Sequence, residues 1–195
     1  QDTRRFADFC RIPVFDPSSP EEAYKMIGEA FEYSEKYNTP VLFRPTTRVC
    51  HAYASIDNCD SPSPKKYEGF VKDSKKWVIF PRLSFANHIM IEKRNVEIGK
   101  DFSTYSANKA EGVNSEKAVV TSGISYAYTK ECLKDYPDVK LIKIATAYPF
   151  PEDFVLSSLE GAKEVLCIEE LSPFIEEQIL KLAGKHGLQL KVSGK

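Results

Sequence analysis

The first fifty residues alternate between short apolar runs and stretches with helical spacing. Residues 3–10 place Phe6, Phe9 and Cys10 on one side of a predicted short helix, with charged residues on the other side. Residues 12–15 predict a short strand that ends at Asp16. This order is typical of the start of an α/β unit.

A longer helix is predicted from residue 20 to about residue 38. Ser19 suits the N-cap, Pro20 suits the first helical position, and Glu22 completes a capping box. Asn38 tolerates the left-handed conformation that ends many helices. The apolar run 41–43 follows as a buried parallel strand, so these residues form a β-α-β crossover, which is too little sheet to be stable alone.

The pattern becomes irregular between residues 54 and 114. A turn-rich segment at 57–64 precedes a basic segment at 65–76. The apolar run 77–80 predicts either an edge strand or a docking segment. Spaced apolar residues over about 82–105 then predict one long amphipathic helix whose lysines and arginines face solvent.

A regular alternation of strands and helices begins at residue 117. Strands are predicted at 118–121, 140–144, 165–168 and 188–192, separated by helices at 125–133, 152–159 and 173–184. This rhythm predicts a compact parallel-sheet domain of flavodoxin-like type, so the chain is assigned to the α/β class.

Two arginines and two threonines lie where the strand 41–43 ends. Pro45 stops the strand, so the motif Arg44-Pro45-Thr46-Thr47-Arg48 is expected at the carboxyl edge of the sheet, where α/β proteins bind ligands. These groups suit a phosphate, a carboxylate or an acidic loop of a partner. Alternatively, the arginines bridge to acidic side chains of a neighbouring domain.

Three further strand ends carry weaker signals. The small residues of Thr121-Ser122-Gly123 permit either tight packing or an anion site at a helix N-terminus. Glu169-Glu170 suggests acid/base chemistry, although adjacent carboxylates on an extended chain point apart, which favours an ion pair or an interface contact. Tyr148-Pro149-Phe150-Pro151 predicts a rigid loop.

Composition narrows the possible functions. The 195 residues include 27 basic and 28 acidic side chains, which gives a net charge of -1. A chain of this charge has no overall positive potential that would attract nucleic acid or an anionic membrane. No apolar run approaches the length of a membrane span, and we expect a cytoplasmic protein. The five cysteines and three histidines lack metal-ligand spacing, so we predict no metal site and no iron–sulfur cluster held by this chain.

Several motifs, in a fixed order, resemble a known family. The chain resembles the alpha subunits of indolepyruvate:ferredoxin oxidoreductases, within the thiamine-diphosphate-dependent 2-oxoacid:ferredoxin oxidoreductase family. The likeness covers nearly the whole chain, and Arg-Pro-Thr-Thr-Arg is its most specific part. The motifs that carry it are Gln1-Asp2-Thr3-Arg4, Arg44-Pro45-Thr46-Thr47-Arg48, Gly123-Ile124-Ser125-Tyr126, Tyr148-Pro149-Phe150-Pro151 and Cys167-Ile168-Glu169-Glu170-Leu171.

The resemblance implies a division into three parts. Residues 1–54 correspond to the C-terminal portion of a thiamine-diphosphate pyrimidine-binding domain, residues 55–114 to a linker, and residues 115–195 to a transketolase C-terminal-like domain. The chain starts without Met inside the family's Gln-Asp-Thr-Arg loop. We therefore expect a piece of a longer protein that is catalytically inactive alone, with no catalytic residue of its own.

The resemblance also implies a reaction for the intact enzyme, the oxidative decarboxylation of an aryl 2-oxoacid such as indolepyruvate. Its cofactors would be thiamine diphosphate with Mg and [4Fe-4S] clusters, none of them bound by this chain alone. Its partners would be a beta subunit, ferredoxin and coenzyme A. Another 2-oxoacid, such as pyruvate or 2-oxoglutarate, and a non-catalytic subunit-interaction module remain alternatives, as does an independent flavodoxin-like nucleotide binder.

The resemblance assigns two groups of residues to the substrate end of the cofactor cleft or to a domain interface. No cofactor-binding residue is identified in this chain. The candidates are Asp2, Thr3, Arg4, Arg44, Thr46, Thr47 and Arg48.

Overall fold

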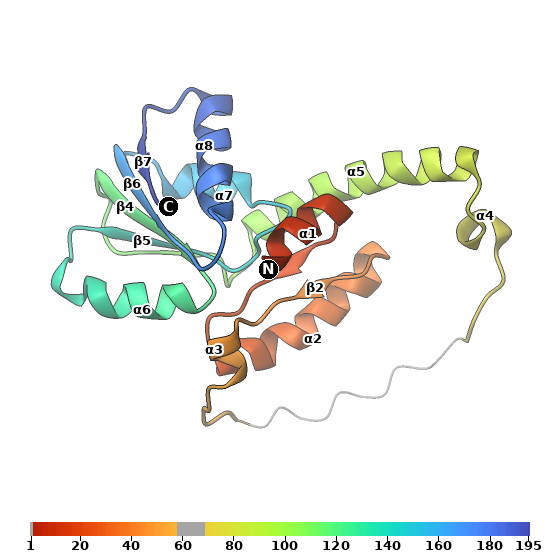
Figure 1. Cartoon of the computed structure of the whole chain (residues 1–195), viewed down its shortest axis with the longest axis horizontal. Helices are drawn as coiled ribbons and strands as arrows, with labels where there is room; N and C mark the ends of the chain where they lie inside the picture. The colour runs from red at the N-terminus through yellow and green to blue at the C-terminus, as the bar shows by residue number, and fades with distance from the viewer. Residues whose placement is uncertain (1, 58–68) are drawn as a thin grey trace.

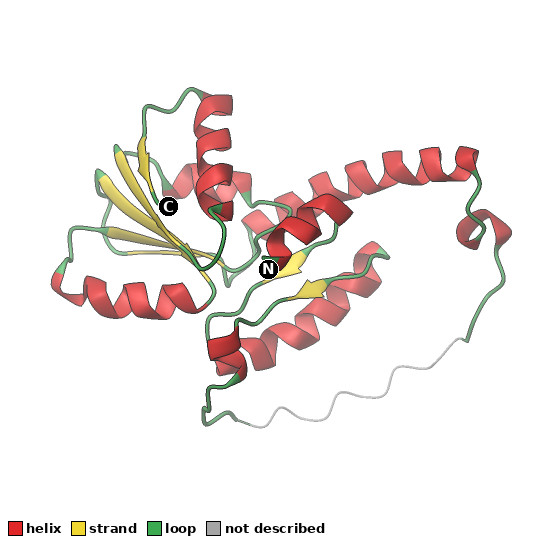
Figure 2. Cartoon of the chain, viewed as in Figure 1, coloured by secondary structure: helices red, strands yellow, loops and turns green. Residues whose placement is uncertain are grey.

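The chain folds around two sheets that lie side by side (Figures 1 and 2). The structure is a computed structural model that describes residues 2–57 and 69–195. Gln1, Cys59 and most of the predicted turn-rich segment lie outside the described residues.

The first sheet has two parallel strands, β1 (Val14–Phe15) and β2 (Leu42–Phe43), as the crossover pattern predicts. Helix α1 (Thr3–Cys10) precedes β1, α2 (Pro20–Tyr37) joins the strands, and a single turn, α3 (Thr47–Cys50), follows β2. The helix signals are confirmed, since Ser19 Oγ accepts a hydrogen bond from the Glu22 amide at 3.2 Å and Asn38 ends α2 with φ +48°. The Glu22 carboxylate accepts from the Ser18 amide at 2.7 Å, one residue earlier than a standard capping box.

A helical connection leads from the first sheet to the second. It consists of α4 (Ser74–Trp77) and the 23-residue α5 (Pro81–Ser103), which confirms the long helix predicted over 82–105. The edge strand considered for 77–80 is wrong, because no described strand lies beside this run to pair with it. Instead the Asp73 carboxylate caps α4 by accepting a hydrogen bond from the Lys75 amide at 2.9 Å.

The second sheet has five strands in the order β3-β5-β4-β6-β7. The central and C-terminal strands are parallel, which confirms the α/β class. They are β4 (Lys117–Ser122), β5 (Lys140–Ile144), β6 (Glu164–Ile168) and β7 (Lys191–Ser193). The predicted last strand at 188–192 is shifted, because residues 188–190 precede the pairing of β7 with β6.

Strand β3 (Lys109–Glu111) was not predicted and pairs antiparallel with β5 at the edge of the sheet. Its sequence, Lys-Ala-Glu, has no apolar alternation, because an edge strand with exposed side chains has no need of one. It lies before residue 115, the start proposed for the C-terminal domain, and that boundary stays a prediction.

Helices cover both faces of the second sheet (Figure 1). On one face, α7 (Glu152–Ser158) and α8 (Phe174–His186) pack with Val120, Ile142 and Val165 into the larger core. The other face carries α6 (Ile124–Cys132), which continues into a 3-10 turn at Leu133–Asp135.

The loop that follows β5 joins the two sheets. The Val14 amide donates to the Tyr148 carbonyl, and the Asp16 amide donates to the Ala145 carbonyl, each at 2.7 Å. A second core forms at this junction from Phe15, Met26, Ala30, Ile98, Phe102 and Ala145. The predicted rigid loop at 148–151 is therefore a buried structural connection as well as a link between elements.

A buried charge network as the candidate functional site

Arg4 lies at the centre of a charge network between the two sheets. Its side chain is 1% exposed, although α1 lies at the surface. The guanidinium bonds Asp2 at 2.6 Å and Glu169 at 2.7 Å. It also donates to the carbonyls of Glu170 at 2.8 Å and Ser172 at 3.1 Å, so one side chain satisfies both a local and a distant set of acceptors.

Each carboxylate in this network also holds a backbone segment. Asp2 caps α1 by accepting from the Arg4 amide at 3.1 Å. Glu169 accepts from the amides of Ile175 at 2.9 Å and Glu176 at 3.1 Å, which fixes the start of α8. Burial opposes ionisation of Asp2, but the hydrogen bonds and charge of Arg4 prevail and lower its pKa to about 2.

A second ion pair lies beside the first. Arg44 Nη1 donates to Asp16 Oδ2 at 2.9 Å, and both side chains are almost fully buried. Burial raises the pKa of Asp16 to about 6, and the charges of Arg44 and Arg4 only partly offset that effect. Asp16 is therefore a carboxylate whose ionisation depends on the surrounding arginines.

The space around Asp16 is closely filled. A Cβ added to Gly123 would lie 3.0 Å from Asp16 Oδ1 and 3.1 Å from Thr46 Cγ2, and the φ of Gly123 is +54°. Within the described residues, Asp16 Oδ1, Thr46 Oγ1 and Thr121 Oγ1 are buried without a hydrogen-bond partner. The close contacts at Gly123 support the tight-packing interpretation of Thr121-Ser122-Gly123, and the choice between packing and an anion site stays a prediction.

The structure separates the seven candidate residues into two groups. Asp2, Arg4, Arg44 and Thr46 converge on the buried junction at the carboxyl ends of the strands. Thr3, Thr47 and Arg48 are exposed at the surface. The two arginines of the Arg-Pro-Thr-Thr-Arg motif therefore differ, since Arg44 is engaged by Asp16 and only Arg48 presents its side chain to solvent.

This geometry changes both interpretations of the arginine motif, namely a ligand site at the sheet edge and a bridge to acidic side chains of a neighbouring domain. Arg44 does pair with a carboxylate, but Asp16 follows β1 within the same small sheet. Contact with the other sheet is made by Arg4 through Glu169, which confirms the ion pair predicted for Glu169-Glu170.

Asp16 is the site residue that sequence reasoning missed. The sequence pattern marks Asp16 only as the end of a strand. An aspartate directly after one of two parallel strands nevertheless lies at the same sheet edge as the arginine that follows the other strand, and this relation between Asp16 and Arg44 is the signal for it.

A groove of about 630 Å³ opens between α2 and α6. Most of its charges are compensated: Lys143 pairs with Glu22, and Lys134 pairs with Glu131 at 2.7 Å. The lining carries five lysines and four glutamates, so its charge is nearly balanced and does not by itself select a charged ligand.

Metal ligands are not grouped in the described part of the chain. No cluster of three or more His, Cys, Asp or Glu side chains there could hold a metal ion. Cys10, Cys50, Cys132 and Cys167 are free thiols. No helix among the described residues is long and apolar enough to cross a bilayer.

Comparison with known proteins shows which proteins this chain is similar to, which the geometry of the site alone does not show. Over 203 residues, the chain is 36% identical to indolepyruvate oxidoreductase subunit IorA of Thermococcus kodakarensis and 34% identical to that of Pyrococcus horikoshii. The same subunit of Methanothermobacter thermautotrophicus is 34% identical over 199 residues. Each comparison covers 100% of this chain. The chain thus resembles one segment of IorA along its whole length.

This similarity confirms the resemblance predicted from the motifs. The chain spans only about 31% of the length of the IorA relatives from Thermococcus and Pyrococcus. No protein-family model matches the chain.

Solved structures share the fold at low sequence identity. A 2-oxoglutarate:ferredoxin oxidoreductase from Magnetococcus marinus matches 93% of this chain and 38% of its own, with a TM-score of 0.58 and 15% identity. A split-gene transketolase matches 94% of this chain and 47% of its own, with a TM-score of 0.52 and 12% identity. These likenesses support the transketolase C-terminal-like architecture predicted for the parallel sheet.

Proposed function

We propose that this chain is part of an oxidoreductase that oxidatively decarboxylates aryl 2-oxoacids, indolepyruvate in particular, with coenzyme A and ferredoxin. The observation that carries the proposal is the similarity to IorA over 100% of the chain, at 34–36% identity in three relatives. In this proposal the enzyme is cytoplasmic and includes a beta subunit.

We also propose the three-part division at residues 1–54, 55–114 and 115–195. Support for an incomplete first domain comes from its two-stranded sheet, in which β2 has no described strand along its outer edge. Phe6 and Phe9 on α1 are 58% and 85% exposed, which is unusual for large apolar side chains on a short helix beside a sheet edge. Further strands and helices of a pyrimidine-binding domain would cover both features.

The cofactors of the proposed enzyme are thiamine diphosphate with Mg and [4Fe-4S] clusters. Thiamine diphosphate supplies carbanion stabilisation, and the clusters accept electrons singly. The described residues lack a grouped ligand set for either metal centre, so we assign no cofactor ligand and derive no chemical step from this chain.

The buried and exposed candidates have different roles in this proposal. Arg4 and Arg44 position the strand ends, because their guanidiniums are already engaged by Asp2, Glu169 and Asp16. Arg48, with Thr47 and Thr3, is accessible and suits contact with a substrate carboxylate or with a neighbouring domain.

The test is steady-state kinetics of the complete enzyme carrying Arg48→Ala. If Arg48 binds the substrate carboxylate, KM for indolepyruvate rises about tenfold or more, since a charge-assisted hydrogen bond contributes about 1.5–3 kcal/mol. Lys163→Ala is the control, because Lys163 is an exposed cation just before β6, in the other sheet. An unchanged KM removes Arg48 from the substrate site.

A substrate profile separates the proposed activity from its nearest alternative. The Magnetococcus structure contains 2-oxoglutarate, coenzyme A and succinyl-CoA, which keeps a different 2-oxoacid as the second candidate. Preference of the complete enzyme for pyruvate or 2-oxoglutarate over indolepyruvate would favour that candidate.

The isolated chain tests the remaining alternatives. We expect no 2-oxoacid-dependent dye reduction and no thiamine diphosphate binding by calorimetry. Activity of the chain alone would contradict its assignment as an incomplete part. A complete enzyme that keeps full activity without this segment would favour a non-catalytic interaction module, and FMN or a nucleotide that co-purifies would favour a flavodoxin-like binder.

A further inference from the structure

A helical arm projects from the body of the molecule (Figure 1). We define the arm as residues 70–90, which include α4 and the first ten residues of α5. Further along α5, Asn95, Ile98 and Phe102 are buried against the body. The arm is therefore the outer part of the connection between the two sheets, and most of its side chains face solvent.

The arm carries many large apolar side chains that are exposed. Ile79 is 84% exposed and Phe80 63%, although contact of apolar surface with water is unfavourable. Clusters of this kind mark surfaces that bind another protein segment or a membrane. The large exposed apolar residues of the arm are Phe70, Val71, Trp77, Val78, Ile79, Phe80, Phe85, Ile89 and Met90.

The arm is also basic. Lys72, Lys75, Lys76 and Arg82 stand against a single carboxylate, that of Asp73, which caps α4. None of these four cations forms an ion pair within residues 2–57 and 69–195. A surface that covers the arm should therefore present carboxylates as well as apolar side chains.

The helical connection touches the first sheet at one turn. Lys76 Nζ donates to Asn38 Oδ1 at 3.4 Å, and Arg94 Nη1, further along α5, donates to the Asn38 carbonyl at 3.1 Å. Asn38 ends α2 and precedes β2, so the arm is held beside the turn through which the chain enters β2. These polar contacts leave Ile79 and Phe80 exposed, and the apolar side chains of the arm need another cover.

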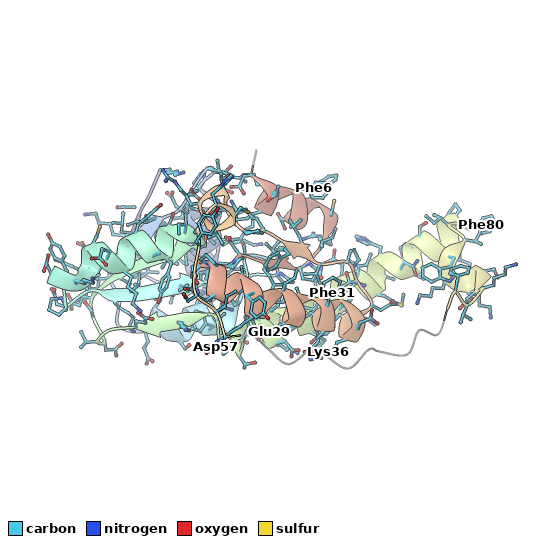
Figure 3. The ribbon with its side chains drawn as sticks, turned by 90° about the horizontal axis from the view of Figure 1, so that it is seen from below. Phe6, Glu29, Phe31, Lys36, Asp57 and Phe80 are labelled. Atoms are coloured by element: carbon cyan, nitrogen blue, oxygen red, sulfur yellow. The ribbon has the colours of Figure 1, made fainter. Side chains whose placement is uncertain are left out.

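The first sheet is also uncovered on the side of β2. Ile27 and Phe31 of α2 are 38% and 69% exposed and line a hollow of about 100 Å³ with Val41 and Phe43. β2 pairs with β1 on one edge and with no described strand on the other. Figure 3 shows Phe31 on α2 and Phe80 on the arm at separate positions along the molecule, so the arm does not fill this hollow.

We propose that the arm is a docking surface for the part of the longer protein that extends the first sheet beyond β2, and that this part presents apolar side chains and carboxylates to it. The inference rests on the proposed function, in which the first domain is incomplete. A strand added to the outer edge of β2 lies about 4.8 Å from it. Such a strand and the helices that cover it come next to the turn at Asn38, where the arm is bonded.

The position of the arm favours this occupant over a separate protein. The chain spans only about 31% of the length of the IorA relatives from Thermococcus and Pyrococcus, so these relatives have further sequence for such an extension. At the other end of α5, Ile98 and Phe102 belong to the core that includes Phe15 and Ala145. With the arm docked, one helix contacts both the extended first sheet and the junction of the two sheets, and so fixes their relative position.

The test is hydrogen–deuterium exchange of the backbone amides of residues 74–90, in this chain alone and in the complete subunit without other proteins. Docking stabilises the helices of the arm, so we expect exchange in the complete subunit to be slower by about tenfold or more. Dilution of the complete subunit should not change that rate, because a contact within one molecule is independent of concentration. No substrate is used, so a complete subunit that fails to oxidise indolepyruvate would contradict the proposed function and leave this test valid.

Variants identify the surface that docks. Phe80→Asp should remove most of the protection in the complete subunit and leave the melting temperature of this chain alone unchanged, because Phe80 is exposed here. Tyr136→Asp is the matched control, since Tyr136 is 58% exposed and directly follows the 3-10 turn beside the second sheet.

A charge reversal tests the acidic character of the covering surface and needs no apolar substitution. Lys75→Glu combined with Arg82→Glu should speed exchange of the arm in the complete subunit. The increase should be larger at low salt than at high salt, because salt screens the interaction between exposed charges. Circular dichroism of each variant distinguishes loss of docking from loss of the fold.

Four results would overturn the proposal. The first is equal exchange of the arm in this chain and in the complete subunit. Protection that appears only after the beta subunit is added would assign the arm to that subunit, and protection that falls on dilution would assign it to a second copy. Phe80-dependent binding of the complete subunit to vesicles of phosphatidylserine and phosphatidylcholine would assign it to a membrane surface.

Discussion

The Arg4 guanidinium and the Glu169 carboxylate meet at 2.7 Å although 165 positions separate them in the chain. Both side chains are about 1% exposed, so both charged groups lose their hydration when this buried ion pair forms. Arg4 and Glu169 also bind the backbone around them, which makes the pair the principal polar connection between α1 and the second sheet.

Replacement of Arg4 by Ala should strongly destabilise the chain. The substitution leaves the Asp2 and Glu169 carboxylates buried near each other without their common cation. Loss of one partner from a buried pair costs about 3–5 kcal/mol, and urea denaturation would measure the change in unfolding free energy.

The matched control is Arg5→Ala on the same helix. Arg5 pairs with Glu177 at 2.6 Å, but the two side chains are 45% and 48% exposed. Its removal should cost no more than about 1 kcal/mol. Equal effects of the two substitutions would show that burial does not determine the contribution of Arg4.

Gly123→Ala should destabilise the junction more than Gly187→Ala. Gly187 lies in the left-handed region with φ +64° and ψ +29°, where an alanine costs about 1–2 kcal/mol. Gly123 has φ +54° with ψ -143°, outside that region, and an added Cβ there would also lie within 3.1 Å of Asp16 Oδ1 and Thr46 Cγ2, so both its backbone conformation and its contacts should add to the cost. Thermal unfolding of both variants measures the difference, and equal melting temperatures would contradict the close-packing argument.

Ionisation of Asp16 should lower stability as the pH rises. Burial raises its pKa to about 6 in the folded chain, against the ordinary aspartate value of 3.8. Between these values the folded state binds more protons than the unfolded state, so the stability that Asp16 contributes is lost as pH increases through about 6. The full effect is on the order of 3 kcal/mol.

The measurement is the unfolding free energy of the chain and of Asp16→Asn from pH 4 to pH 7. The advantage of the parent over the variant should shrink as pH rises across this range, because the variant cannot ionise at this position. A constant difference would show that Asp16 titrates at the same pH in the folded and unfolded states.

Arg44→Ala and Arg48→Ala should affect the chain in different ways. Removal of Arg44 leaves Asp16 buried without its nearest cation and should cost about 3 kcal/mol or more. Arg48 is exposed and forms no ion pair in the described ranges, so its removal should change stability by less than about 0.5 kcal/mol.

In the complete enzyme, the Arg44 change should also disturb subunit assembly, which size-exclusion chromatography would detect. Retention of normal stability and assembly by Arg44→Ala would remove the Asp16–Arg44 pair from any positioning role.

Local signals predicted the elements where the determinants of structure lie close together in the sequence. Ser19, Pro20 and Asn38 mark the ends of α2 correctly, because caps depend on neighbouring backbone groups. The parallel pairing of β1 with β2 likewise follows from a short crossover. Strand β3 was missed, since it is defined only by its pairing with β5 and not by its own composition.

The candidate site was predicted less completely because its contacts join distant segments. The motif identified Arg44 and Arg48 as equivalent candidates, and only the fold shows that one faces Asp16 and the other faces solvent. The resemblance places Arg4 at the substrate end of the cofactor cleft or at an interface, and its burial against Glu169 depends on how the two sheets meet.

The backbone bond between Val14 and Tyr148 also bears on how the chain folds during synthesis. The carbonyl that pairs with Val14 follows 134 residues later in the chain. β1 therefore remains without this neighbour until those residues have been synthesised, and contacts of such long range slow folding. During this interval the edge of β1 that later meets Tyr148 is open, so the nascent chain should depend on early protection from aggregation.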